Sequence, residues 1–256
     1  MDQLIQWNCR SAISKKNDII NLINKQSPFL LALSETWLAP HKIFNISGYH
    51  CIKEDRDDDY GGVALLIRAN LSYSQISLPN HSDQLSIVAC TVNSICFVSV
   101  YIPYPSTQIF DELNSIISNL PKPFIMLGDF NSKHQAWGCS FSNGHGKYLL
   151  EIMNSNNLCF LNTGSPTRRS KPSHGNSALD LTICTPDLAS SLSWYTLSST
   201  YGSDHFPIVV AFPFKSPNTQ YRKTRLRHNI NRNKWNEFSQ EVDVLMSSSD
   251  IFNKQV

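Results

Sequence analysis

Short apolar runs constrain the fold of this chain more than any other feature of its sequence. In GGVALLIR (61–68) and ICFVSVYI (95–102), almost every residue is apolar or small. Strands that are covered on both faces have continuous apolar sequences of this kind. The runs predict eleven strands, at residues 3–9, 29–34, 48–53, 62–68, 84–92, 95–102, 124–128, 157–161, 179–184, 193–198 and 206–212.

Helical periodicity is rarer and marks three segments. Ser14 is a candidate N-cap for a helix that ends near Lys25, and residues 109–120 and 146–154 repeat apolar side chains at helical spacing. Many strands with few amphipathic helices predict an α/β fold, a sandwich in which helices cover the outside of two stacked sheets. At 41% hydrophobic residues, the chain has enough apolar material for such a core.

The apolar density falls after Pro213–Pro217, which predicts one domain over residues 1–214 and an extension over residues 215–256. The domain carries 14 Lys and Arg against 16 Asp and Glu (−2), and the extension carries 8 against 4 (+4), which together give the net charge of +2. Between Lys215 and Lys234 there are seven basic residues and no acidic one. Such a run is typical of a solvated linker, our default interpretation, or of an arm that contacts an anionic polymer.

The seven cysteines form no CxxC pair and show no spacing typical of zinc ligands. We therefore expect free thiols and a reducing compartment. No apolar stretch approaches the roughly 18 residues of a membrane-spanning helix, and the N-terminus has no signal-peptide pattern. The sequence predicts a soluble, intracellular protein without membrane contact.

Polar residues stand within or beside the apolar runs at six places. A bare carboxylate in such a position carries a large desolvation cost unless it is paired or bound to a metal. One case could be accidental, but six predict a shared cleft. The residues are Asn8, Glu35, Tyr101, the pair Asp129 and Asn131, Asp180, and the group Ser203, Asp204 and His205.

The residue types in this set suit one kind of chemistry. Glu35 supplies the hard oxygen ligands that Mg²⁺ prefers. His205 with Asp180 suggests an imidazole that a carboxylate orients, and Asp129 is placed to accept a proton from water. Tyr101 is placed to donate toward phosphoryl oxygens. Together they predict metal-assisted attack of water on a phosphodiester.

Seven motifs in order make the pattern specific, although each one alone is weak. They are QWNCRS, LALSETWL, GGVALLIR, SVYIPY, GDFNSKHQAWG, PTR with SALDLTI, and SDHFPI, spread over residues 3–212. In this order the chain resembles the endonuclease/exonuclease/phosphatase superfamily, and most closely the apurinic-endonuclease-like domain of LINE-type (non-LTR, Jockey-like) retrotransposons. The resemblance implies a deoxyribonuclease-like fold, a four-layered α/β sandwich of two mostly antiparallel sheets flanked by helices.

The resemblance also implies roles for the residues that match its motifs. Glu35 and Asn8 would hold Mg²⁺, with Mn²⁺ as an alternative, and Asp204 would lie near the metal or the leaving oxygen. Asp129 would activate the attacking water, which Asn131 would position.

The remaining implied roles concern the phosphate and the DNA. His205, held by Asp180, would contact the scissile phosphate, which Tyr101 would also bind. Thr167 and Ser203 would support the site, and Asn143 would touch the DNA backbone.

The chain departs from the cellular repair members of the superfamily at Arg10. Those members often have Asp two residues after the first Asn, whereas retroelement members commonly lack it. Arg10 therefore favours the retroelement relationship and leaves the second metal ligand open.

The segment TRRSKPSHGN (167–176) is basic and separates two predicted strands. With Arg168, Arg169 and Lys171, it would lie along a DNA groove and add affinity for the backbone. The alternative is an ordinary solvated loop. The tryptophans Trp7, Trp37 and Trp137 are interpreted as core residues rather than as stacking platforms for bases.

These expectations combine into one function. The chain is predicted to be a Mg²⁺-dependent DNA endonuclease that nicks one strand, so that the 3′-hydroxyl primes reverse transcription of the element's RNA. Its partners would be target DNA and a reverse-transcriptase polyprotein to which it is fused or from which it is cut, and it would act in the nucleus; the oligomeric state stays open. The alternatives are a cellular abasic-site repair endonuclease, a catalytically dead nucleic-acid-binding remnant, and a lipid or inositol phosphate phosphatase.

Overall fold

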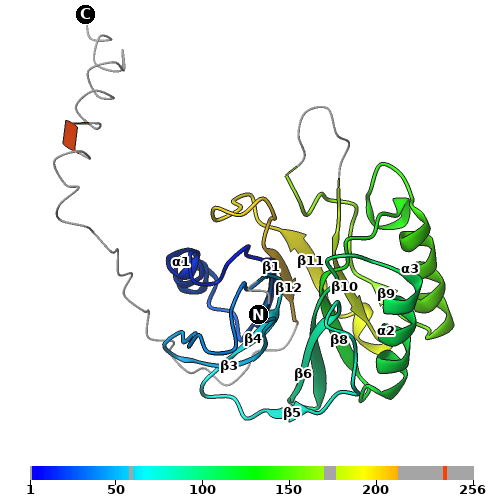
Figure 1. Cartoon of the computed structure of the whole chain (residues 1–256), viewed down its shortest axis with the longest axis horizontal. Helices are drawn as coiled ribbons and strands as arrows, with labels where there is room; N and C mark the ends of the chain where they lie inside the picture. Colours follow the sequence, from blue (N-terminus) through cyan, green and yellow to red (C-terminus); the bar gives the residue numbers. More distant parts are fainter. Residues whose placement is uncertain (1, 58–59, 170–176, 213–238, 241–256) are drawn as a thin grey trace, which may run out of the picture. The chain divides into compact units, whose positions relative to one another are not determined.

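The structure is a computed structural model that describes residues 2–57, 60–169, 177–212 and 239–240. The chain divides into two units, residues 1–224 and 225–256. All helices and strands named below belong to the first unit (Figure 1). The predicted domain end at residue 214 and nearly all of the basic extension lie outside the described residues; Ser239 and Gln240 of the second unit are helical.

Two six-stranded sheets form the centre of the first unit. In spatial order, the first sheet contains β11 (Ser193–Thr196), β12 (Ile208–Ala211), β1 (Gln3–Asn8), β2 (Leu30–Ser34), β4 (Val63–Arg68) and β3 (Tyr49–Glu54). The second sheet contains β5 (Ser74–Ile76), β6 (Ser86–Val92), β7 (Ile95–Tyr101), β8 (Phe124–Asp129), β10 (Asp180–Cys184) and β9 (Cys159–Phe160). Neighbouring strands are antiparallel except for one parallel pair in each sheet, β1 with β2 and β7 with β8.

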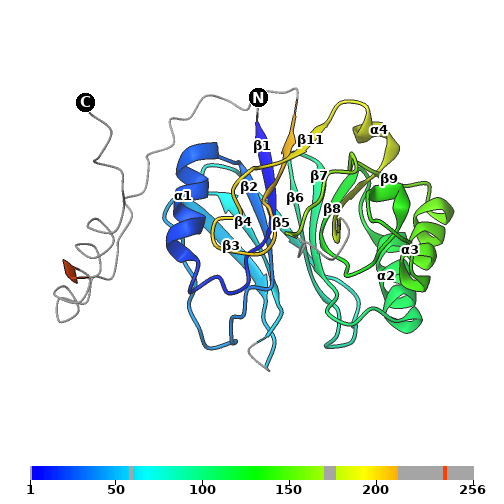
Figure 2. The same ribbon diagram turned by 90° about the horizontal axis from the view of Figure 1, so that it is seen from above.

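Helices cover the outer faces of both sheets (Figure 2). The crossover helix α1 (Lys16–Gln26) joins the parallel strands β1 and β2, and α2 (Thr107–Asn119) joins β7 and β8. Beside α2 lies α3 (Gly144–Ser155); α4 (Pro186–Ala189) and a 3₁₀ turn (Gln135–Trp137) are short. No helix in the described part of the chain has the length and apolar content that a membrane span requires.

Three apolar layers separate the four layers of structure. Between α1 and the first sheet, Ile5 and Trp7 pack against helix residues such as Leu22. A second layer lies between the two sheets, and a third lies between the second sheet and the helices α2 and α3. Because successive side chains of a strand point to opposite faces, strands such as β1 and β8 contribute to two of these layers.

This alternation determines where the polar strand ends point. Leu4 of β1 belongs to the layer between the sheets, so Asn8, four residues later, is on the same face. In β8, Ile125 and Leu127 also belong to this layer, and Asp129 follows them on that face. In the register of the second sheet, Asp129 lies opposite both Tyr101 and Asp180.

The predicted four-layered sandwich of mostly antiparallel sheets is confirmed, and each of the eleven predicted strands is present. Residues 157–161 form only a two-residue strand, Cys159–Phe160, and β5 was not predicted because its residues are largely exposed at a sheet edge. The N-cap predicted at Ser14 is wrong: α1 begins at Lys16 without a side-chain cap. Ser14 instead forms two hydrogen bonds with Ser11.

Candidate active site

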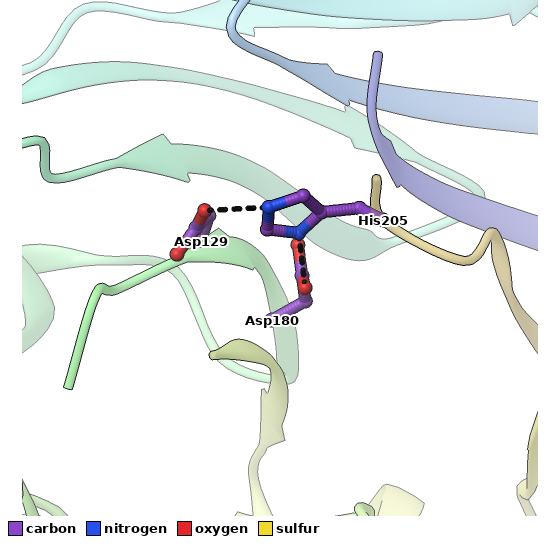
Figure 3. Close-up of side chains that lie close together, drawn as sticks. All are labelled: Asp129, Asp180 and His205. Atoms are coloured by element: carbon purple, nitrogen blue, oxygen red, sulfur yellow. Dashed lines mark hydrogen bonds and ion pairs between the residues drawn. The ribbon is translucent and has the colours of Figure 1, made fainter. Parts of the chain in front are cut away.

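The polar residues at the strand ends meet between the two sheets. Asn8 comes from β1, Asp129 from β8 and Asp180 from β10, and His205 precedes β12. All four are at most 2% exposed. Figure 3 shows Asp129 and Asp180 on either side of the His205 ring. Residues that lie up to 197 positions apart in the chain therefore form one buried cluster.

Asn8 connects the two sheets through its carboxamide. Its Nδ2 donates to Glu35 Oε1 and to Asp129 Oδ2, each at 2.9 Å. Its Oδ1 is buried and has no hydrogen-bond partner among the described residues. Glu35 follows β2 directly, in a left-handed backbone conformation with φ of 50°. A single amide thus joins the carboxylate of one sheet to that of the other.

His205 is held by both its ring and its backbone. Its Nδ1 lies 2.7 Å from Asp180 Oδ2, and its Nε2 lies 3.8 Å from Asp129 Oδ2. The His205 carbonyl accepts a hydrogen bond from Trp7 Nε1 at 3.1 Å. Its N–H donates at 3.1 Å to Ser203 Oγ, which donates in turn to the Asn8 carbonyl at 2.8 Å. The imidazole orientation is therefore fixed from three sides.

Burial and proximity change the protonation of this cluster. Burial raises the pKa of Asp129 to about 7; Asp180 adds to the rise, and His205 opposes it. Burial alone would lower the pKa of His205, but the charge and hydrogen bond of Asp180, together with the charges of Asp129 and Asp204, raise it to about 9. At neutral pH His205 is therefore a cation between carboxylates, and Asp129 titrates in the range that a general base requires.

Thr167 fixes Asp180. Its Oγ1 donates to Asp180 Oδ2 at 2.6 Å and accepts from the backbone N–H groups of Leu179 and Asp180 at 3.1 and 3.2 Å. Thr167 is fully buried, so these bonds are shielded from water. The pair of Asp180 and His205 consequently has little rotational freedom.

Asn131 and Tyr101 complete the cluster around Asp129. The backbone N–H of Asn131 donates to Asp129 Oδ1 at 2.9 Å, and its Nδ2 donates to the Ile102 carbonyl at 3.0 Å. Burial and the negative charge of Glu35 raise the pKa of Tyr101, which keeps its phenol protonated and able to donate. Both residues therefore lie beside Asp129, and Tyr101 is opposite it in the sheet register.

Asp204 is bound by two arginines rather than left open. Arg168 Nε and Nη2 contact its Oδ2 at 3.0 and 2.9 Å, and Arg10 Nη1 lies 3.2 Å from its Oδ1. Although burial works in the opposite direction, His205 and Arg168 lower the pKa of Asp204. The carboxylate therefore stays ionised at neutral pH.

The residues predicted to bind DNA have local roles in the fold. Asn143 caps α3, because its Oδ1 accepts from Gly146 N at 2.8 Å. The Arg169 backbone N–H donates to the Asp204 carbonyl at 2.7 Å, and Arg169 is exposed. Arg168 holds Asp204 as described above, and Lys171 lies outside the described residues.

Two sets of side chains could hold a metal ion. Ligand atoms of Asp129, Asp180 and His205 all lie within 4.8 Å of one another. Both ring nitrogens of His205 already face a carboxylate, however, so this set is better suited to proton transfer. Asn8 Oδ1, a buried acceptor without a partner, and the neighbouring Glu35 offer hard oxygens that fit a divalent cation.

Sequence reasoning missed a polar bridge between the sheets. Gln6 Nε2 donates to the Gly128 carbonyl and its Oε1 accepts from Thr182 Oγ1, both at 3.0 Å. Thr182 Oγ1 also accepts from Trp194 Nε1 at 3.1 Å. The signal was available: Gln6 interrupts an apolar run two residues before Asn8, on the same face.

Trp37 was expected in the core, but it is only partly buried. With Tyr60, Tyr101 and Tyr104 it lines a cavity of about 170 Å³ that reaches Glu35. Trp7 and Trp137 are fully buried, as expected. Aromatic side chains therefore line the cavity next to Glu35.

The known sequences to which the chain is similar come from mobile elements that encode reverse transcriptases. The family model described as endonuclease-reverse transcriptase matches residues 95–209. The chain is 28% identical over 236 residues to the RNA-directed DNA polymerase from mobile element jockey of Drosophila melanogaster, covering 89% of this chain and 25% of that protein. It is 27% identical over 218 residues to the probable RNA-directed DNA polymerase from transposon BS of the same species, covering 82% and 24%. The chain thus spans about a quarter of these relatives.

Solved structures share the fold. The endonuclease domain of TRAS1, a telomere-specific non-LTR retrotransposon, superposes with a TM-score of 0.69 at 19% identity, covering 82% of this chain and 97% of that one. An AP endonuclease from Archaeoglobus fulgidus superposes with a TM-score of 0.67 at 19% identity, covering 84% and 100%. At 19% identity, both similarities show that the sandwich fold is shared.

Proposed function

We propose that the chain, which resembles the nuclease domains of Jockey-like elements and the endonuclease/exonuclease/phosphatase superfamily, nicks one strand of DNA in a Mg²⁺-dependent reaction. The observation that carries the proposal is the double hydrogen bond of Asn8 to Glu35 and Asp129. One amide nitrogen thereby bridges Glu35, the proposed cation ligand, and Asp129, the proposed general base.

In this proposal some residues act on the attacking water and others bind the phosphate. Asp129, with a pKa near neutrality, takes the proton from the attacking water, which Asn131 positions. Cationic His205, oriented by Asp180, stabilises the negative charge that develops on the scissile phosphate, and Tyr101 donates to a phosphoryl oxygen. A divalent cation held by Glu35 and Asn8 would supply further charge neutralisation there.

Plasmid nicking tests the proposal. We expect the wild-type protein to convert supercoiled plasmid to the nicked circle with Mg²⁺ and not with EDTA. Asp129→Ala and His205→Ala should lose nicking by at least about 100-fold while they keep the circular dichroism spectrum of the wild type. Asp187→Ala and His41→Ala, which change exposed residues, serve as matched controls. Full nicking by either site variant would show that the assigned roles are wrong.

The chemistry of the nick tests the link to reverse transcription. A 3′-hydroxyl is extended by a DNA polymerase without further treatment, whereas a 3′-phosphate is not. We expect extension from the nick, as priming of a reverse transcriptase fused to this domain in the nucleus requires. The relatives are named as RNA-directed DNA polymerases, which supports that fusion.

The likeness to AP endonucleases favours one alternative, abasic-site repair. Matched duplex oligonucleotides with and without one abasic site separate the two functions. Strong preference for the abasic duplex would replace the retroelement proposal, and binding without cleavage of either duplex would indicate a catalytically dead remnant.

A further inference from the structure

Arg10 holds a central place beside the cluster that the mechanism above leaves without a role. Its Nη1 lies 3.2 Å from Asp204 Oδ1 and its Nε lies 3.7 Å from Glu35 Oε2. Its guanidinium carbon lies 5.8 Å from the centre of the Trp37 ring, a distance typical of cation–π contacts. The guanidinium thus stands between two carboxylates from different segments of the chain.

Those two carboxylates are the more open acids of the site. The side chains of Glu35 and Asp204 are 15% and 27% exposed, whereas those of Asp129 and Asp180 are 2% and 1% exposed. Accessible carboxylates at the edge of a site are where a dissolved cation would bind. Here the guanidinium already supplies a positive charge to both of them.

We propose that Arg10 is a built-in cation, which serves Glu35 and Asp204 in place of a second metal ion and leaves this site with one divalent ion. Resting on the proposed function, the inference extends to the substrate: the remaining N–H groups of Arg10 bind the scissile phosphodiester. The Arg10 side chain is 45% exposed, so donors remain for a ligand. A guanidinium has five N–H groups in a fixed fork and keeps its charge at any physiological pH.

The partners of Asp204 support this assignment. Arg168 contacts Asp204 Oδ2 through both Nε and Nη2, while Arg10 faces Oδ1. A guanidinium therefore faces each oxygen and compensates the charge of Asp204, although Oδ1 forms an ion pair and no hydrogen bond among the described residues. Glu35 accepts hydrogen bonds from Asn8 and from Tyr101, but its side chain is 15% exposed and stays accessible as a metal ligand.

Substitution of Arg10 is structurally feasible. Arg10 has a φ of 47°, in the left-handed region where Asn and Asp are the best tolerated residues after Gly. Arg10→Asp and Arg10→Asn therefore remove the guanidinium without added backbone strain. Arg10→Asp also places a third carboxylate beside Glu35 and Asp204, which creates an oxygen-rich cation site.

Titration with Mn²⁺ alone, followed by calorimetry, tests the stoichiometry without any cleavage. Sites are counted as those lost in a Glu35→Gln variant, which discounts binding elsewhere on the surface. We expect one such site in the wild type and in Arg10→Lys, and two in Arg10→Asp. Two sites in the wild type, or one in a folded Arg10→Asp, would overturn the inference. Because no DNA is present, the result stands even if the chain cuts nothing.

Cleavage by the Mg²⁺-loaded protein tests the phosphate contact. Arg10→Asn should lower kcat/KM by roughly 100-fold, the typical loss when one preorganised donor to a developing charge is removed. Added guanidinium ion should restore part of that loss in Arg10→Asn and none in Asp129→Ala. A purely structural role would allow no such rescue, so unchanged cleavage or failed rescue contradicts the phosphate contact. Absence of cleavage by the wild type contradicts the proposed function itself and, with it, the phosphate contact.

Discussion

One carboxamide nitrogen, Nδ2 of Asn8, donates to a carboxylate oxygen of each sheet at 2.9 Å. Asn8→Asp replaces this donor by an acceptor of the same shape and adds a negative charge between Glu35 and Asp129. We expect the metal-free variant to lose ~1–3 kcal/mol in its free energy of unfolding, measured by urea denaturation. Asn93→Asp, at an exposed position with positive φ, should leave the stability unchanged. Equal stability of the two variants would mean that the Asn8 bonds contribute little.

Protonation of Asp129 and His205 predicts how stability depends on pH. Both pKa values are raised in the folded protein, to about 7 from 3.8 and to about 9 from 6.5. The folded state therefore binds more protons, and the stability that each group contributes below its unfolded pKa is lost as pH rises through its folded pKa. In EDTA, the free energy of unfolding should fall from about pH 5 to about pH 9 more steeply in the wild type than in the Asp129→Asn, His205→Gln double variant.

A matched double variant provides the control for this pH dependence. Asp187→Asn with His41→Gln changes one exposed carboxylate and one exposed imidazole. Its slope against pH should equal that of the wild type. If the buried double variant kept the wild-type slope as well, the raised pKa values would be wrong.

The sequence predicted the members of the site better than their contacts. Asp129, Asp180 and His205 were recognisable because an ionisable residue inside an apolar run has to be compensated. That Asn8 bonds to both Glu35 and Asp129 could not be predicted, because the distance between the two sheets is set by tertiary packing. From the sequence, Arg10 could be interpreted only as the replacement of a metal ligand. Its contacts depend on a left-handed backbone conformation that the residue type does not indicate.

At the scale of elements, the bridge of Gln6, Thr182 and Trp194 joins β1 to β10 just below the acidic cluster. Thr182→Val keeps the shape of the side chain but leaves Gln6 Oε1 and Trp194 Nε1 buried without this partner. We expect a loss of ~2–4 kcal/mol in the free energy of unfolding, measured by urea denaturation. Ser34→Ala is the control, because Ser34 Oγ is buried and has no hydrogen-bond partner among the described residues. A similar loss in both variants would argue for packing rather than for the bridge.

Helix capping gives a second element-scale prediction. Ser106 Oγ accepts from Ile109 N at 3.3 Å at the start of α2, whereas Ser14 caps nothing. Ser106→Ala should lower the melting temperature in proportion to a loss of ~1 kcal/mol, and Ser14→Ala should change it much less. Reversed effects in thermal denaturation would reinstate the cap that the sequence suggested.

The strands were predictable because burial on both faces leaves a mark in the sequence, and β5 escaped because it has none. Helix starts were less predictable: α1 has no side-chain cap although Ser11 and Ser14 precede it, whereas Ser106 caps α2 and Asn143 caps α3. Which residue caps a helix depends on how the preceding segment leads into that helix, and this is a property of the tertiary structure.

At the scale of the whole molecule, the basic segment 215–256 remains a prediction of the sequence. If it contacts DNA, each neutralised phosphate adds about 0.9 to the slope of log affinity against log salt. Removal of residues 215–256 should therefore weaken DNA binding and flatten this slope, measured by fluorescence anisotropy at several salt concentrations. A full-length variant with the seven basic residues from Lys215 to Lys234 changed to Gln should behave like the truncation. Unchanged slopes in both would identify the segment as a linker.

The last strand of the domain, β12, lies against the first, with Gln3 opposite Ala211. During synthesis, β2 is available to β1 early, but the antiparallel neighbour β12 leaves the ribosome only after nearly the whole domain. A product released before residue 205 would lack both His205 and β12, so the cluster of Asn8, Asp129, Asp180 and His205 could not form.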